Sequence, residues 1–173
     1  MNLKSQISNL KSSCLRRGDG FSLIEVLIAV ILIGLAITAL LAANGSFTIA
    51  NSAGTDLSTA EFLIEQIREL MALLPVVDPQ TGTSTFGPEE TGLTYYDDLD
   101  DFDGASFSPP IDSNRNVLNN FAAFSQLVIV ENVNPSNFEQ VVSDHSTSFI
   151  RVTVNVLLNT KQITSTSWIR ARY

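Results

Sequence analysis

Residues 20–25 read GFSLIE, and residues 26–43 follow as VLIAVILIGLAITALLAA, a stretch without a charged side chain. Glu25 is therefore a lone carboxylate at the start of a long apolar run. An acidic side chain is costly in a membrane, so its presence here indicates a functional role. The sequence before the run is basic instead, and its four cationic residues are Lys4, Lys11, Arg16 and Arg17.

The apolar run predicts one membrane-spanning helix. Residues 21–43 would extend over roughly 34 Å as a helix, which is enough to cross a hydrocarbon core of about 30 Å. The basic residues before the helix should stay cytoplasmic, so the acidic remainder should face the periplasm or the cell exterior. The main alternative is a cleavable secretory signal with a cut before Ser46, after the small residues Ala43 and Gly45. The length of the apolar run argues against that alternative.

The order of residues at the start of the run resembles the processing site of type IV prepilins and type II secretion pseudopilins. The six residues that carry the resemblance are Gly20, Phe21, Ser22, Leu23, Ile24 and Glu25. It implies that prepilin peptidase, a membrane-embedded aspartyl protease, cuts between Gly20 and Phe21 and then N-methylates Phe21. An ordinary signal-anchor helix that happens to contain a glutamate is the alternative interpretation.

The resemblance also implies a role for Glu25 in assembly. Glu25 would pair with the terminal amine of a neighbouring subunit, since a buried charge is costly alone and tolerable when paired. The family often has a proline near position 42, where this chain has Ala42. The fold it implies is α+β and pilin-like, with a long N-terminal helix packed on a small antiparallel sheet.

Composition fits one domain and an anchor. We expect a basic leader at residues 1–20, a transmembrane and assembly helix at 21–45, and a periplasmic or extracellular globular domain at 46–173. Without the leader the chain has six Lys and Arg against seventeen Asp and Glu, so direct binding to nucleic acid is not expected. The single cysteine, Cys14, lies in the leader, which leaves the processed subunit without a disulfide or a thiolate metal site.

Apolar periodicity predicts the secondary structure of the domain. Apolar residues recur at three- and four-residue steps from Leu57 to Leu74, which predicts an amphipathic continuation of the helix, weakened at Gly54 and ended by Pro75. Residues 75–120 carry most of the prolines and glycines and predict a long loop. Strands are expected at 124–133, 149–158 and 162–170, in a sheet of three or four strands, with a hairpin turn at 159–161.

An acidic cluster in the predicted loop is a candidate calcium site, and calcium is the one cofactor that the sequence suggests. Its members are Asp97, Asp98, Asp100, Asp101 and Asp103. Oxygen ligands in a flexible loop suit Ca²⁺, but the EF-hand pattern fails because Leu99 and Pro110 occupy two of its ligand positions. A solvated acidic loop is the default interpretation of such a cluster. Four nearby aromatic residues are expected to fold the loop onto the sheet: Tyr95, Tyr96, Phe102 and Phe107.

No combination of residues in the sequence predicts an enzyme. His145 is the single histidine and is expected in a polar loop rather than in a catalytic site. The sequence predicts a structural subunit of a pilus or pseudopilus in the inner membrane and then in a filament. Prepilin peptidase, other pilins and an inner-membrane assembly platform would be its partners. The absent cysteines and Ala42 favour a minor type II secretion pseudopilin.

Two alternatives to the pseudopilin stay open. A minor type IV pilin or a competence pilin is the first, because it would share the same processing site. The second is of another class, a membrane-anchored or secreted calcium-binding module that does not assemble. An intact leader or a mature chain that starts at Ser46 would indicate that module.

Overall fold

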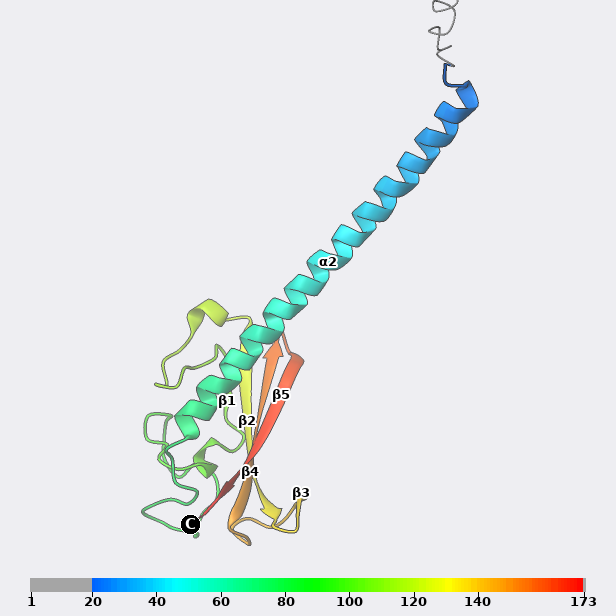
Figure 1. Ribbon diagram of the computed structural model, residues 1–173. Helices are drawn as coiled ribbons and strands as arrows, with labels where there is room; N and C mark the ends of the chain where they lie inside the picture. The colour runs from blue at the N-terminus through cyan, green and yellow to red at the C-terminus, as the bar shows by residue number, and fades with distance from the viewer. Residues whose placement is uncertain (1–19, 173) are drawn as a thin grey trace, which may run out of the picture. The chain divides into compact units, whose positions relative to one another are not determined.

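The computed structural model describes residues 20–172, in the order one long helix, irregular loop and antiparallel sheet (Figure 1). The leader expected at residues 1–20, with Cys14, lies outside the described residues except for Gly20. The chain divides into two compact units, the first ending at Ile49 and the second beginning at Ala50. Helix α2 (Leu23–Met71) contributes residues to both units.

Helix α2 is continuous over 49 residues. Its most apolar 18-residue window has a mean hydropathy of 3.0 and none of that window is buried, so the helix is long and apolar enough to cross a membrane. The helix continues through Gly54, where the sequence predicts a local weakening. A single glycine costs a helix only about 1 kcal/mol, less than the neighbouring turns and the packing of the following residues provide.

The second half of α2 packs on the sheet through one stripe of residues. The expected helical periodicity is confirmed, and the buried members are Ala60, Leu63, Ile64, Ile67, Leu70 and Met71. Leu57, expected in the same stripe, is 41% exposed, and Leu74 lies beyond the last helical residue. The helix therefore ends close to Pro75, as the restriction before proline predicts.

The sheet is antiparallel and has five strands in the order β1-β2-β4-β5, with β3 paired to β2. The strands are β1 (Ser106–Phe107), β2 (Phe124–Asn134), β3 (Asn137–Val141), β4 (Phe149–Leu158) and β5 (Lys161–Ala171). The expected count of three or four strands is too low because β1 and β3 were missed. β1 has only two residues and every residue of β3 is exposed, so neither has an alternation that a sequence pattern could reveal.

Two central strands form the sheet side of the core. Alternate residues of β2 and β4 are buried, and these are Phe124, Gln126, Val128, Val130, Asn132, Ile150, Val152, Val154 and Val156. The second half of α2 covers this face, as Figure 1 shows. Two members of the inward face, Gln126 and Asn132, are polar, and both are fully hydrogen-bonded to backbone groups.

The loop between α2 and β2 is long but anchored. It contains two short 3₁₀ helices, η1 (Asp100–Phe102) and η2 (Asn119–Phe121). Leu99 and Phe102 are completely buried in the core, and the ring of Tyr96 packs edge-on against Phe102 with centroids 5.1 Å apart. The expected role of the aromatic residues is confirmed for Tyr96, Phe102 and Phe107, whereas Tyr95 is 67% exposed.

Candidate functional site

The start of α2 is closed by a reciprocal pair of hydrogen bonds. The backbone N–H of Ser22 donates to Oε2 of Glu25 at 2.8 Å, and the backbone N–H of Glu25 donates to Oγ of Ser22 at 3.3 Å. The first helical hydrogen bond runs from the N–H of Val26 to the carbonyl of Ser22 at 3.2 Å. This is a capping box with Ser22 as the N-cap residue. The carboxylate of Glu25 also lies where the helix dipole favours negative charge.

The peptide bond between Gly20 and Phe21 lies just outside the helix. Neither residue has regular secondary structure, and the side chain of Phe21 is 87% exposed. A β-carbon at Gly20 would meet no atom of residues 20–172 within 4 Å. A protease can therefore reach this bond without unwinding α2. Cleavage would leave an ammonium group on Phe21, one residue before the N-cap.

In the single chain, the carboxylate of Glu25 thus accepts a hydrogen bond from the backbone of Ser22. Pairing with an amine of another subunit would use the oxygen that is free of the Ser22 N–H, or displace that contact. The sequence carried the signal for the cap, since a serine followed three residues later by a glutamate before an apolar run is the pattern of a capping box. Sequence reasoning missed this signal.

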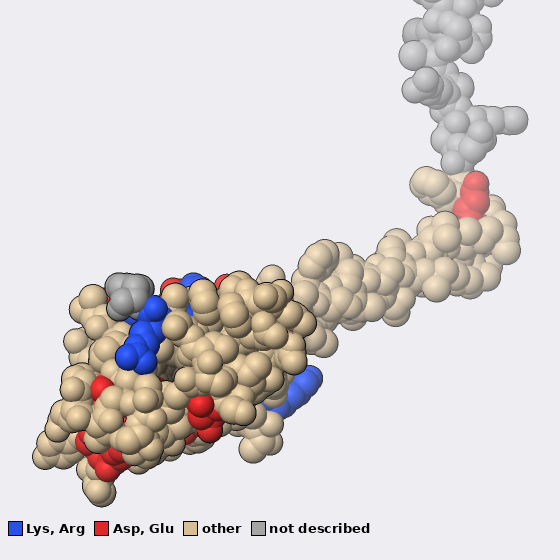
Figure 2. Space-filling view, turned by 90° about the horizontal axis from the view of Figure 1, so that it is seen from below, with Lys and Arg blue, Asp and Glu red and all other residues tan. Residues whose placement is uncertain are grey.

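The first half of α2 presents an unbroken apolar surface. Between Leu23 and Ile49, the large apolar side chains are at least half exposed on all sides of the helix. Figure 2 shows one acidic side chain near the start of this helix and no charged side chain along the stretch that follows. Such a surface is unfavourable in water and has to be covered by lipid or by other helices.

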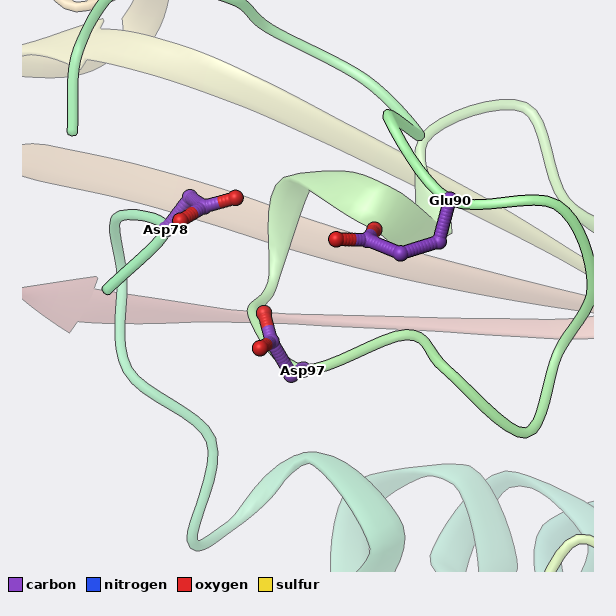
Figure 3. Close-up of side chains that lie close together, drawn as sticks. All are labelled: Asp78, Glu90 and Asp97. Atoms are coloured by element: carbon purple, nitrogen blue, oxygen red, sulfur yellow. The ribbon is translucent and has the colours of Figure 1, made fainter. Parts of the chain in front are cut away.

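Carboxylates from three parts of the long loop meet at a second place. Asp78, Glu90 and Asp97 bring ligand atoms within 4.8 Å of one another, and their carboxylates point toward a common centre (Figure 3). Ligand atoms also lie within 4.8 Å of one another in a second group, which consists of Glu89, Glu90 and Asp101. The two groups share Glu90. We call Asp78, Glu89, Glu90, Asp97 and Asp101 the five-carboxylate cluster.

The electrostatics of the cluster differ from one member to the next. Burial and the adjacent carboxylates of Asp101 and Asp97 raise the pKa of Glu90. The backbone N–H of Thr81 donates to Oδ1 of Asp78 at 2.7 Å and lowers the pKa of Asp78. Several carboxylate oxygens thus face one another, and this arrangement disfavours the charged form of Glu90.

Two of the expected calcium ligands form a separate pair. Burial raises the pKa of Asp98 to about 8 and also raises the pKa of Asp100. Oδ2 of Asp100 accepts the backbone N–H of Gly87 at 3.2 Å, whereas Oδ2 of Asp98 and Oδ1 of Asp100 are buried without a hydrogen-bond partner among residues 20–172. Nε2 of His145 lies 3.9 Å from Asp100. This pair lies outside both groups of carboxylates whose oxygens converge.

The expected solvated loop is wrong for three of its acids. Asp98, Asp100 and Asp101 are at most 2% exposed, because η1 carries them into the core beside Phe102. Asp103 lies outside both groups of carboxylates, and its Oδ1 accepts the backbone N–H of Val130 at 2.9 Å.

Of the five predicted ligands, only Asp97 and Asp101 belong to the five-carboxylate cluster. The other three members of the cluster are Asp78, Glu89 and Glu90, which sequence reasoning missed. They lie 7 to 19 residues before Asp97, in a segment without periodicity, and no spacing rule could have joined them to it.

Comparison with known proteins gives a match for the processing segment and the first part of α2. Residues 15–41 match the family model described as the prokaryotic N-terminal methylation motif. The match is consistent with a type IV prepilin-like family, and the motif implies processing by prepilin peptidase and assembly of the pilin kind. Together with the apolar half of α2, it indicates a membrane-anchored protein with one span. No curated protein and no solved structure matches the chain.

Proposed function

We propose that the chain is a structural subunit of a pilus or pseudopilus, and within that group a minor type II secretion pseudopilin. The observation that carries the proposal is the methylation motif at the start of an apolar helix whose side chains are exposed in the described part of the chain. Prepilin peptidase would remove the leader on the cytoplasmic side, and the subunit would wait in the inner membrane with its globular domain in the periplasm.

Assembly follows from the surface of α2. The apolar half is covered by lipid before assembly and by the helices of neighbouring subunits afterwards, so little apolar area has to face water in either state. Small residues such as Gly34, Ala36 and Thr38 lie in the middle of this half and let helices approach closely. Other pilins and an inner-membrane assembly platform would be the partners.

Glu25 would fix the axial register of the assembly. A carboxylate among apolar helices is favourable only where it meets a cation, and the amine of a neighbouring Phe21 is a suitable one. The capping box keeps the carboxylate ordered until that amine arrives, because Ser22 holds Glu25 at a defined place on the first turn. One polar contact in an otherwise apolar bundle is the kind of feature that selects a register.

The finer assignment to a minor pseudopilin rests on two features. The processed chain would have no cysteine, and α2 passes Ala42 without a proline or an interruption. A minor type IV pilin shares the processing, so deletion of the gene separates the two possibilities. Loss of protein secretion with normal surface pili supports the pseudopilin, and loss of pili with normal secretion contradicts it.

The first experiment is mass spectrometry of the intact protein and its N-terminal peptide, after recovery from native membranes. We expect a chain that begins with N-methylated Phe21. A chain that begins at Ser46, or one that retains the leader, would overturn the proposed function.

A further inference from the structure

We propose that the five-carboxylate cluster binds a calcium ion that fixes the long loop to the globular domain. The site lies in the second compact unit, apart from the processing segment, and the proposal does not rest on assembly. Its ligands would come from three segments of the loop, around residues 78, 89–90 and 97–101.

The first argument is that Glu89 and Asp97 each use one carboxylate oxygen within the loop and leave the other without a hydrogen-bond partner among residues 20–172. In Glu89, Oε1 accepts the hydroxyl of Thr81 at 3.1 Å, and Oε2 is buried without a partner. In Asp97, Oδ2 accepts Nε2 of Gln80 at 3.3 Å, and Oδ1 is buried without a partner. One oxygen of each acid is thus used to orient the other, as supporting contacts do around metal ligands.

Asp101 provides the second and strongest argument. The residue is only 1% exposed, and its Oδ2 accepts the backbone N–H groups of Asp97 at 2.8 Å and Asp98 at 3.3 Å. Among residues 20–172 its Oδ1 is buried and has no hydrogen-bond partner, and a carboxylate oxygen of Asp101 lies within 4.8 Å of oxygens of Glu89 and Glu90. A buried, unpartnered carboxylate oxygen is costly unless a cation or a donor meets it.

Within the described part of the chain, no lysine or arginine forms an ion pair with the five-carboxylate cluster. Among residues 20–172, the ion pairs of lysine and arginine join Arg68 to Glu65 and Arg151 to Glu131 and Glu139, all outside the cluster. Carboxylates within 4.8 Å of one another repel strongly at reduced dielectric. An external cation is therefore the simplest source of compensating charge.

The ligand chemistry favours calcium over other cations. Every candidate ligand is a carboxylate oxygen, which excludes the soft and nitrogen-preferring metals from first choice. Ca²⁺ accepts six to eight oxygens in irregular geometry, whereas Mg²⁺ demands a near-octahedral shell and keeps several waters. Acids on three separate loop segments suit the irregular coordination of Ca²⁺ better than the octahedral shell of Mg²⁺.

Binding is tested on the processed full-length chain in detergent micelles, first treated with a chelator. We expect saturable calcium binding by calorimetry with a dissociation constant on the order of 10⁻⁴ M, and a melting temperature raised by roughly 5–10 °C at saturating calcium. Terbium should show luminescence sensitised by the nearby Tyr96, reversed by added calcium. No saturable binding up to about 10 mM calcium, or tighter binding of magnesium, would overturn the proposal.

A matched pair of variants separates a calcium site from mere acidity. Glu90→Gln removes the carboxylate shared by both groups, and we expect calcium affinity to fall at least about tenfold. Glu61→Gln removes the same charge from the exposed face of α2 and should leave calcium binding unchanged. Equal calcium affinity in wild type and Glu90→Gln would overturn the proposal.

The behaviour in chelator provides a second readout. With calcium removed, Glu90→Gln should melt at or above the temperature of the wild type, because one repelling charge is gone. If Glu90→Gln does not fold, Glu89→Gln gives the same comparison. All of these measurements use unassembled protein, so failure of the calcium site and failure of the filament proposal are distinguishable.

Discussion

The side chain of Gln126 on β2 donates a hydrogen bond from Nε2 to the carbonyl oxygen of Leu63 on α2, at 2.9 Å. The same Nε2 also donates to the carbonyl of Ile111 at 3.1 Å, and Oε1 accepts the backbone N–H of Ile111 at 2.8 Å. Gln126 is completely buried. One polar side chain thus joins the sheet, the helix and the long loop inside an otherwise apolar core.

Replacement of this glutamine should destabilise the domain. Gln126→Met keeps the approximate shape but leaves the buried N–H and carbonyl of Ile111 without these partners, which costs about 1–3 kcal/mol. The measurement is denaturant unfolding of the full chain in micelles. Gln162→Met changes an exposed glutamine of β5 in the same way and should be nearly neutral. Equal stability of the two variants would show that the bonds of Gln126 contribute nothing measurable.

Arg170 on β5 binds backbone carbonyl groups at the C-terminal end of α2. Its guanidinium donates to the carbonyl of Met71, the last helical residue, at 3.2 Å, and to those of Ala72 at 3.0 Å and Leu74 at 3.1 Å in the segment that follows. The single ammonium group of a lysine cannot reproduce hydrogen bonds from the two terminal nitrogens of a guanidinium. We expect Arg170→Lys to lower the unfolding free energy by about 1–2 kcal/mol, measured by thermal melting. Arg172→Lys, at an exposed position, is the control, and an unchanged melting temperature for Arg170→Lys contradicts the expectation.

The turn between β4 and β5 offers a stabilising substitution. Asn159 and Thr160 form a two-residue connection, and both have positive φ, at 48° and 71°. Type I′ turns have this pattern and favour glycine at the second position, whereas a β-branched residue is strained there. Thr160→Gly should stabilise the domain by about 0.5–1 kcal/mol and raise its melting temperature by a few degrees. A lower melting temperature would mean that the threonine side chain has a contact of greater value than the strain.

The helix and the central strands could be predicted from the sequence because each buries one face with a fixed period. Ala60 to Met71 repeat at helical spacing, and residues 150–156 of β4 alternate without exception. β2 was also found, although Gln126 and Asn132 interrupt its apolar face. Their inward direction could not be read from the pattern, because it depends on backbone groups contributed by α2 and by the loops.

The cluster of carboxylates marks the limit of sequence reasoning. Asp97 and Asp101 were chosen because acids are dense there, but Asp78 and Glu90 come from turns whose course no periodicity determines. The path of the loop is set by the burial of Leu99 and Phe102, a long-range packing event. By contrast, the processing segment is local, since six consecutive residues carry its signal.

Leader removal should depend on the absence of a side chain at Gly20. Gly20→Val places a branched side chain beside the bond to be cut and should reduce processing to a small fraction of the wild-type rate, because the protease must approach the backbone closely. The measurement is a gel-shift assay of leader loss in cells that express prepilin peptidase. Gly34→Val carries the same change within the apolar helix and should be processed normally. Normal cleavage of the Gly20 variant before Phe21 would refute the assigned site.

The charge of Glu25 and its capping role can be separated by substitution. Glu25→Gln keeps an oxygen that can accept the N–H of Ser22, since glutamine serves in capping boxes as glutamate does. Ser22→Ala keeps the carboxylate but removes the hydroxyl that accepts the N–H of Glu25. Glu25→Ala removes the charge and the acceptor for the N–H of Ser22, and it keeps the backbone N–H that donates to the hydroxyl of Ser22.

All three variants should lose their leader, because the bond between Gly20 and Phe21 lies outside the helix. If Glu25 pairs with the amine of a neighbour, Glu25→Gln should assemble at least about tenfold less well than the wild type, since one partner of a buried pair is then missing. Ser22→Ala should assemble nearly normally and show only fraying of the first helical turn. Assembly is measured as the fraction of processed subunit in sheared filaments, or by cross-linking in the membrane. If Ser22→Ala fails while Glu25→Gln assembles, the carboxylate acts through the helix cap, and the pairing of charges has to be abandoned.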